Sequence, residues 1–266
     1  MKSDIDLNDS DRVMRLIVTS GKLPKHFYKY TDIDTLKLIL ESSSLKFSNP
    51  SEFNDPFDCN LTIDTNNSQE EIEAYISQVK RSKNLNNEQV KEIRRSFHSP
   101  QKLHDITNRS ISDAKETFGV TCFSKKPDSI LMWSHYADKH RGACLKFNIL
   151  SDAEFFMTPF PVKYKRKYPK YNYIRNREGT AKFLLETKSI DWKYEKEIRV
   201  MKRGANLYNF KKKALCGIFF GANTPDADKE VIMDLVDKLN FDAVNFKSAL
   251  ISKKKFEVKL KKHSRL

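Results

Sequence analysis

Alternating apolar and polar residues along this chain predict a series of β-strands. Three of them lie at HFYKYT (26–31), SLKFS (44–48) and GVTCFS (119–124), which are rich in the aromatic and β-branched residues that strands favour. ACLKFNI (143–149) and DWKYEKEIRVM (191–201) continue this pattern. Strands are therefore expected in both halves of the chain.

Three more strands are predicted in the C-terminal half, at 161–168, 217–222 and 254–262. In the last of these, apolar residues occupy one face and charged residues, mostly lysines, occupy the other. Lysines are common on edge strands because they oppose pairing with another chain. We therefore expect 254–262 to lie at the edge of a sheet.

Apolar residues at helical spacing predict helices between these strands. Asp32 is placed to cap a helix that runs toward the strand at 44–48. Residues 68–118 form a long helical stretch, which opens with a capping box of Ser68 and Glu71. A further helix is expected over 128–140.

Strands and helices mix without regular βαβ spacing, which favours an α+β fold over a doubly wound sheet. The chain is long enough for one large domain, and we predict a single domain over residues 1–266. Residues 64–118 interrupt the strand-rich flanks and are predicted to be a helical insert or subdomain.

Composition excludes several classes of protein. Only seven glycines are present, and no glycine-rich phosphate loop or dinucleotide-binding fingerprint occurs. No apolar run approaches the roughly 20 residues of a membrane span, so no membrane partner is expected. The four cysteines are scattered without a CxxC pair, which indicates reduced core residues and a cytoplasmic protein.

The chain carries a formal net charge of +14 and has a pI near 9.4. Between residues 163 and 213, 17 basic residues accompany five acidic ones. Such a charge attracts nucleic acid, although lysines that merely solvate the surface would give the same count. If nucleic acid binds, the interleaved lysines and tyrosines of 162–177 are the expected contacts, namely Lys165, Arg166, Lys167, Tyr168 and Lys170.

Three blocks of sequence resemble a known family. They are residues 27–58, residues 119–147, and WKYEKEIRV (192–200) with the downstream GIFFGA. In this order they are similar to the bacterial domain-of-unknown-function family 2971. That family name carries no activity by itself.

A more distant resemblance is to the DNA-targeting toxin ADP-ribosyltransferases. Their first strand carries a Tyr-His-x-Thr motif, to which YKYT (28–31) is similar, and their catalytic strand resembles KEIRV (196–200). The resemblance implies a mostly antiparallel split sheet, consumption of NAD, and Glu197 as the catalytic residue. It also implies contacts with NAD from the first strand, where a lysine replaces the family's histidine: Tyr28, Lys29, Tyr30 and Thr31.

Glu195, Glu197 and Arg199 are two residues apart on the predicted strand, so all three are expected on one face. A carboxylate such as that of Glu197 can stabilise the oxocarbenium-like transition state in which the ribose–nicotinamide bond breaks. Glu195 would then activate the acceptor, and Arg199 would keep the carboxylates ionised or bind a phosphate of NAD. The alternative is a solvated strand face with ion pairs.

Further candidate contacts lie in a loop and a helix. Asn54, in the FNDPFD loop, is a candidate for the nicotinamide pocket, and a proline-braced turn with capping side chains is the alternative. His135 and Tyr136 are candidates to stack on a ring of NAD or to bind its phosphate, although packing of the helix against a sheet explains them as well. The histidine spacing is not that of a helical zinc pair, and no metal is expected.

Three functions follow from these observations. The first is an NAD-dependent ADP-ribosyltransferase-like enzyme that acts on nucleic acid as a toxin or phage-defence effector. A neutralising or sensor protein is a candidate partner for such an effector. The second is a non-catalytic nucleic-acid-binding module on the same fold. The third is a metal-independent nuclease that uses His135 and Glu195.

Overall fold

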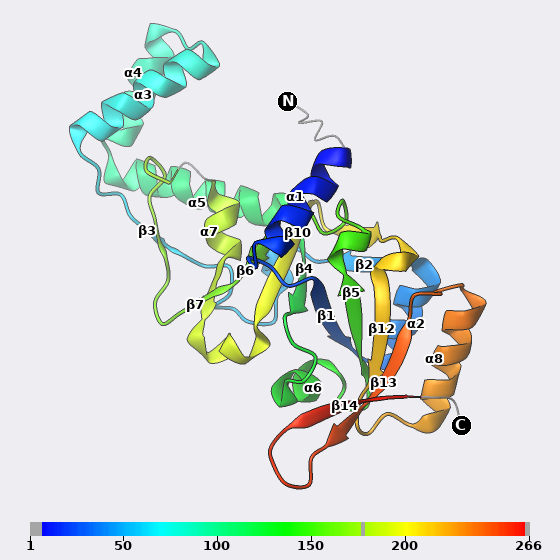
Figure 1. Ribbon diagram of the computed structural model, residues 1–266. Coiled ribbons are helices and arrows are strands. Elements are labelled where there is room, and N and C mark those ends of the chain that lie inside the picture. Colours follow the sequence, from blue (N-terminus) through cyan, green and yellow to red (C-terminus); the bar gives the residue numbers. More distant parts are fainter. Residues whose placement is uncertain (1–6, 177–178, 264–266) are drawn as a thin grey trace. The chain divides into compact units, whose positions relative to one another are not determined.

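The computed structural model describes residues 7–176 and 179–263 (Figure 1). The chain divides into two compact units. The first unit comprises Met1–Ser48, Gly119–Val162 and Asp191–Leu266, and the second comprises Asn49–Phe118 and Lys163–Ile190. The predicted helical insert at 64–118 is part of the second unit.

The first unit is built on an eight-stranded sheet with the strand order β14-β13-β12-β5-β1-β4-β10-β6. Five neighbouring pairs run antiparallel, and β12 and β13 run parallel. The fold is therefore α+β with a mostly antiparallel sheet. The strands are β1 (His26–Thr31), β4 (Phe118–Ser124), β5 (Ala143–Asn148), β6 (Pro159–Pro161), β10 (Glu197–Arg203), β12 (Leu215–Phe220), β13 (Asn245–Ile251) and β14 (Val258–Lys262).

The two faces of this sheet carry different clusters of buried side chains. Phe27, Phe123 and Ile198 belong to a large cluster that also includes side chains of α1 (Leu7–Thr19), α2 (Ile33–Ser42) and α8 (Asp226–Lys238). Tyr30 belongs to a smaller cluster with Trp133 of α6 (Ile130–Tyr136). Because neighbours along a strand point to opposite faces, the residues that alternate with the large cluster lie on the face of α6.

Several elements of this unit match the sequence pattern closely. β1 covers the predicted residues, and Asp32 caps α2 by accepting a hydrogen bond from the Thr35 amide. β14 ends the sheet, as predicted for a lysine-rich edge strand, but it begins only at Val258, and residues 254–257 of the predicted strand lie in the hairpin turn. Shorter elements complete the unit: β2 (Ser44–Phe47) paired with β11 (Asn206–Asn209), and the 3₁₀ helices η2 (Ile149–Ser151), η3 (Ile190–Glu195) and η4 (Lys212–Ala214).

Two other predicted elements of the first unit were also wrong in extent. The strand predicted over 191–201 begins only at Glu197, because residues 190–195 form η3 and Lys196 has a left-handed backbone with φ of 49°. The helix predicted over 128–140 ends at Tyr136. Asp138, Lys139 and His140 all have positive φ, which is incompatible with continuing a right-handed helix.

The second unit is mainly helical. Ile72, Ile76, Val90, Phe97 and Leu103 form its core with Ile174. The capping box of Ser68 and Glu71 is present as predicted. The elements are η1 (Pro50–Glu52), α3 (Gln69–Lys83), α4 (Asn87–Phe97), α5 (Pro100–Thr117), α7 (Thr180–Leu185), and two parallel strand pairs, β3 (Thr62–Ile63) with β8 (Lys170–Tyr171) and β7 (Lys163–Lys165) with β9 (Thr187–Ser189).

One predicted strand is divided between the units. The strand expected over 161–168 is replaced by β6 in the first unit and β7 in the second, with Val162 between them. No described helix has the length and apolar character that crossing a membrane requires. None of the four cysteines, all of which lie in the described part of the chain, forms a disulfide bond.

Candidate functional site

A buried ion pair lies at the start of β10. The Arg199 guanidinium donates to both carboxylate oxygens of Glu197, with Nε–Oε1 at 2.8 Å and Nη2–Oε2 at 3.2 Å. Arg199 is fully buried and Glu197 is 4% exposed. Both alternate with Ile198 and Val200, which belong to the large apolar cluster, so the pair lies on the face of α6.

The two residues therefore share a face, as the sequence predicted, but the face is not solvated. Taking a carboxylate and a guanidinium out of water is costly, and the two-point contact compensates for part of that cost. The arrangement fixes the orientation of the Glu197 carboxylate within the protein.

Glu195 is a second buried carboxylate, at 3% exposure. It ends η3, so it reaches its position from a 3₁₀ turn and not from β10. The Tyr136 hydroxyl of α6 donates to its Oε1 at 2.6 Å, and the Ser124 hydroxyl of β4 donates to its backbone oxygen at 2.6 Å. These bonds hold the turn before β10 against α6 and β4.

Tyr28 and Tyr30 lie on the same face as the ion pair. Tyr30 packs edge-on against Trp133, and its hydroxyl donates to the Lys126 carbonyl at 2.8 Å. Tyr28 lies beside Phe219. Burial raises the pKa of both phenols, so both remain protonated donors at neutral pH.

Lys29 and Thr31 point to the opposite face, because they alternate with these tyrosines. The Lys29 ammonium donates to the Thr121 hydroxyl at 3.0 Å and to the Cys122 carbonyl at 3.3 Å, and it lies 5.6 Å from the centre of the Phe123 ring. Burial lowers the pKa of Lys29, while Cys122 and Glu197 act in the other direction. Of the four predicted residues of β1, only the two tyrosines share a face with Glu197.

Cys122, Ser124 and Tyr194 belong to this region, although sequence reasoning did not select them. Burial raises the pKa of the Cys122 thiol, and the nearby Glu197 carboxylate raises it further. Tyr194, in η3, packs with its ring against the cluster that contains Trp133. Cys122 and Ser124 alternate along β4 with side chains that point to the opposite face. This two-residue period was the only feature of the sequence that could have placed them on the face of Glu197.

Some residues of α6 with polar atoms pack in the interior, and others contact η3. His135 is exposed, and its Nδ1 lies 3.2 Å from the Tyr194 hydroxyl. Trp133 is fully buried and donates to the Pro127 carbonyl at 2.9 Å. His135 is thus hydrogen-bonded to Tyr194 while Glu195 is hydrogen-bonded to Tyr136. The pairing of His135 with Glu195 that a nuclease would use is not among the described hydrogen bonds.

The basic stretch 162–177 belongs mostly to the second unit, and Arg177 lies outside the described residues. Tyr171 packs against Phe183, and Tyr173 packs against Tyr75 and Phe97. Tyr171 is buried by this packing, and Tyr173 is half-buried. The five predicted nucleic-acid contacts are all exposed: Lys165, Arg166, Lys167, Tyr168 and Lys170.

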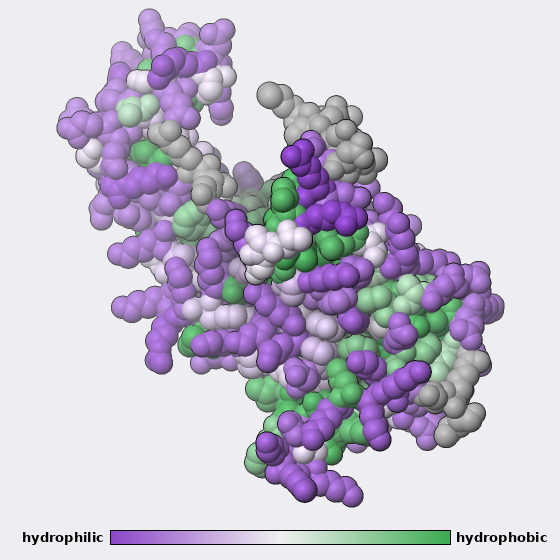
Figure 2. Space-filling model, viewed as in Figure 1, coloured by the Kyte–Doolittle hydropathy of each residue, from purple (hydrophilic) through white to green (hydrophobic). Residues whose placement is uncertain are grey.

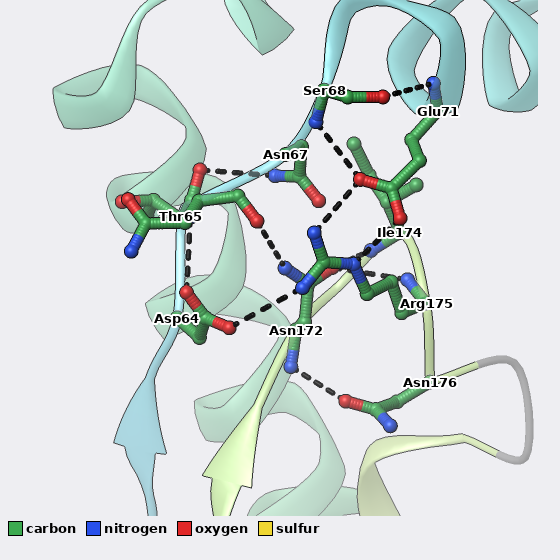
Figure 3. Close-up of polar contacts among 10 residues, drawn as sticks. Asp64, Thr65, Asn67, Ser68, Glu71, Asn172, Ile174, Arg175 and Asn176 are labelled. Atoms are coloured by element: carbon green, nitrogen blue, oxygen red, sulfur yellow. Dashed lines mark hydrogen bonds and ion pairs between the residues drawn. The ribbon is translucent and has the colours of Figure 1, made fainter.

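Two other basic residues of this stretch are paired with carboxylates. Figure 3 shows Arg175 between Glu71 and Asp64, and its Nε and Nη2 donate to the two Glu71 oxygens at 2.7 and 2.8 Å. The hydrogen bonds from Arg175 lower the pKa of Glu71 to about 2. The Lys163 ammonium lies 2.7 Å from Glu186. These ion pairs hold Lys163 and Arg175, near the two ends of the stretch, in place. The five predicted contacts between them stay exposed.

The FNDPFD loop forms the turn that the sequence offered as an alternative. Asp55 Oδ1 accepts from the Phe57 amide at 2.9 Å, and Asp58 Oδ1 accepts from the Cys59 amide at 2.7 Å. Asp58 also lies 3.6 Å from the buried Lys188 ammonium. Asp55 Oδ2 is buried and has no hydrogen-bond partner among the described residues. Asn54 is exposed and belongs to the second unit.

Among the described residues, no cluster of three or more His, Cys, Asp or Glu side chains is placed to hold a metal ion. The polar contacts on this face are instead those of Glu197 with the Arg199 guanidinium and the Cys122 thiol, and that of Glu195 with the Tyr136 phenol. Such groups can orient a polar substrate, stabilise positive charge and move a proton.

One family model matches part of the chain. It describes a protein of unknown function (DUF2971), and it matches residues 132–200. Over these residues the chain is similar to that family. The matched segment includes most of α6 and the start of β10, and hence Tyr136, Glu195, Glu197 and Arg199. No curated protein and no solved structure gives a significant match.

Proposed function

We propose that this chain is an NAD-consuming enzyme of the ADP-ribosyltransferase type, with Glu197 as the catalytic carboxylate. The observation that supports this proposal is the buried polar cluster on one sheet face, where Arg199 fixes the carboxylate of Glu197 and Tyr136 binds that of Glu195. Buried carboxylates that are held in place by specific partners are frequent at catalytic sites.

In the proposed reaction the bond between C1′ of the ribose and the nicotinamide nitrogen breaks, and its electron pair leaves with nicotinamide. Positive charge develops on the ribose, and Glu197 stabilises it. The acceptor then attacks C1′, and Glu195 takes the acceptor's proton. NAD is a substrate here, because it is consumed.

The arrangement of the first strand decides which residues would hold NAD. Tyr28 shares the face of Glu197, and its half-buried ring and hydroxyl suit a nucleotide. Tyr30 shares this face too, but its hydroxyl is bonded to the Lys126 carbonyl and its ring packs against Trp133, so it supports the site from behind. Lys29 and Thr31 belong to the opposite face and are not used in the proposal. Tyr136 is bonded to Glu195, and His135 is bonded to Tyr194, the residue before Glu195. Both stay candidates to contact NAD.

Release of nicotinamide from NAD tests this function. The purified chain is incubated with millimolar NAD, alone and with single-stranded or double-stranded RNA or DNA, and free nicotinamide is measured by chromatography. We expect release, and transfer of ADP-ribose to the nucleic acid that serves as acceptor. Absence of release under all these conditions would overturn the proposal.

A second candidate function, nucleic-acid binding without catalysis, is favoured by the exposed basic residues of the second unit. Lys165, Arg166 and Lys167 follow one another and have no ion-pair partner among the described residues. Exposed cations of this kind neutralise phosphates and release counterions, and Tyr168, at 43% exposed, can stack on a base.

Replacing Lys165, Arg166 and Lys167 together by glutamine is expected to weaken binding to single-stranded RNA. The slope of log K against log salt should fall by about 2, since each phosphate contact contributes roughly 0.7. Fluorescence anisotropy at several salt concentrations measures this slope.

The matched control replaces Lys80, Arg81 and Lys83 of α3, which are also exposed and have the same composition, by glutamine. We expect little change in that variant. Equal loss in both variants would indicate attraction by net charge alone, and would contradict a defined binding site at 165–170.

A further inference from the structure

The last hairpin of the chain leaves one side of the sheet open. β13 and β14 pair antiparallel from Ile251 with Val258 to Lys247 with Lys262. β14 is the terminal strand of the sheet, and no further described strand pairs with it. An edge strand presents a row of backbone N–H and C=O groups to which another extended segment can bond.

This edge is strongly basic. Lys259, Lys261 and Lys262 are exposed along β14, and three more lysines, at 253–255, lie in the turn of the hairpin. Glu257 is the only acidic residue between 251 and 263. It pairs with Lys259 at 3.2 Å, while Lys261 and Lys262 have no ion-pair partner among the described residues.

Apolar side chains are exposed beside these lysines. Phe256 is fully exposed in the turn, and Ile251 is 63% exposed. Residues 251–258 line a cavity of about 420 Å³ together with Ile130 and His140. Figure 2 shows hydrophobic surface next to hydrophilic side chains at the lower end of the view, where α6 and the hairpin lie in Figure 1.

We propose that the outer edge of β14 and the adjoining turn bind an extended acidic segment of a partner protein, which adds a ninth strand to the sheet. The backbone groups of β14 would bond the segment, its carboxylates would face the lysines, and an apolar side chain would cover Phe256. This proposal is independent of the proposed enzymatic function.

Charge complementarity selects this occupant over the others. A second copy of the chain would place the lysines of two β14 edges against each other, which destabilises strand pairing. Nucleic acid would satisfy the lysines but would leave the backbone groups of the strand edge and the aliphatic Ile251 without a matching partner. An extended acidic peptide offers carboxylates to the lysines, backbone groups to the strand edge and an apolar side chain to Ile251.

The test selects peptides on the full-length chain from a displayed library with Asp or Glu at alternate positions and random residues between them. Binding of a selected peptide is measured by fluorescence anisotropy. In Lys259→Glu/Lys261→Glu its affinity should fall roughly tenfold or more, because two attractions become repulsions. Phe256→Ser should weaken binding several-fold, and Lys238→Glu, an exposed lysine of α8, should leave it unchanged.

A second measurement separates strand addition from simple charge attraction. Hydrogen–deuterium exchange of residues 258–262 should slow when the peptide is bound, because new backbone bonds protect their amides. Circular dichroism establishes that each variant is folded. The proposal is overturned if no peptide is enriched on the wild type relative to the double variant. It is likewise overturned if binding leaves 258–262 unprotected, or if RNA or anionic vesicles bind the edge in preference to every selected peptide.

Discussion

Glu197→Gln is expected to lower the rate of NAD consumption by about 100-fold or more. The amide has nearly the same size as the carboxylate but no charge, so it cannot stabilise the positive charge that develops on the ribose. The measurement is nicotinamide release at saturating NAD, divided by the concentration of folded protein. Loss of activity with NAD binding retained would place the effect on the chemical step.

A loss of activity in Glu197→Gln has to be separated from a loss of folding stability, because the substitution also leaves the buried Arg199 without the charge of Glu197. Ile198→Val provides a matched control. Ile198 is fully buried, is the next residue of β10 and points to the opposite face of the sheet. Ile198→Val should lower the free energy of unfolding by about 0.5–1.5 kcal/mol without changing the Glu197 carboxylate. If Ile198→Val lost activity as fully as Glu197→Gln, the catalytic assignment would be wrong.

β1 and α2 could be predicted because their local signals agree with their final environment, whereas the seven-residue strand β13 of the same sheet was not predicted. β1 alternates between residues of the two clusters, from Phe27 on one face to Tyr28 and Tyr30 on the other. Asp32 directly follows β1 and caps α2, which is a local hydrogen bond that the sequence alone can indicate.

The segment before Glu197 could not be predicted, because its pattern also fits a strand. DWKYEK alternates in polarity, yet it forms a 3₁₀ turn that ends in the left-handed Lys196. Non-glycine residues adopt this conformation at a cost, and contacts distant in sequence have to compensate for it. The bond from Ser124 to the Glu195 carbonyl, across 71 residues, is one such contact.

In the candidate site, too, contacts between residues close in sequence could be predicted, and contacts between distant residues could not. The shared face of Glu197 and Arg199 follows from a separation of two residues. The bond between Tyr136 and Glu195 joins residues 59 apart, and no spacing rule links them. The sequence implied that Lys29 points to the face opposite Tyr28 and Tyr30. It did not show which of these two faces carries Glu197, because that depends on where β10 lies in the sheet.

Arg199→Met is expected to lower the free energy of unfolding of the first unit by about 3–5 kcal/mol. Methionine has a similar length and no charge, so it would leave the Glu197 carboxylate buried without its guanidinium partner. Urea unfolding at neutral pH measures the effect. Both tryptophans of the chain, Trp133 and Trp192, belong to the first unit, so their fluorescence reports on this unit alone.

The double variant Glu197→Leu/Arg199→Met tests the cause of that loss. Replacing both charges by apolar groups removes the desolvation cost together with the attraction, and in other proteins such exchanges are often neutral or stabilising. We therefore expect the double variant to be more stable than Arg199→Met and to lack NAD consumption. If the double variant were instead less stable than Arg199→Met, Glu197 would have a stabilising role of its own. If it recovers the stability of the wild type, the pair is not required for folding, and its burial on the face of Tyr30 and Tyr136 is better explained by the chemistry proposed for Glu197.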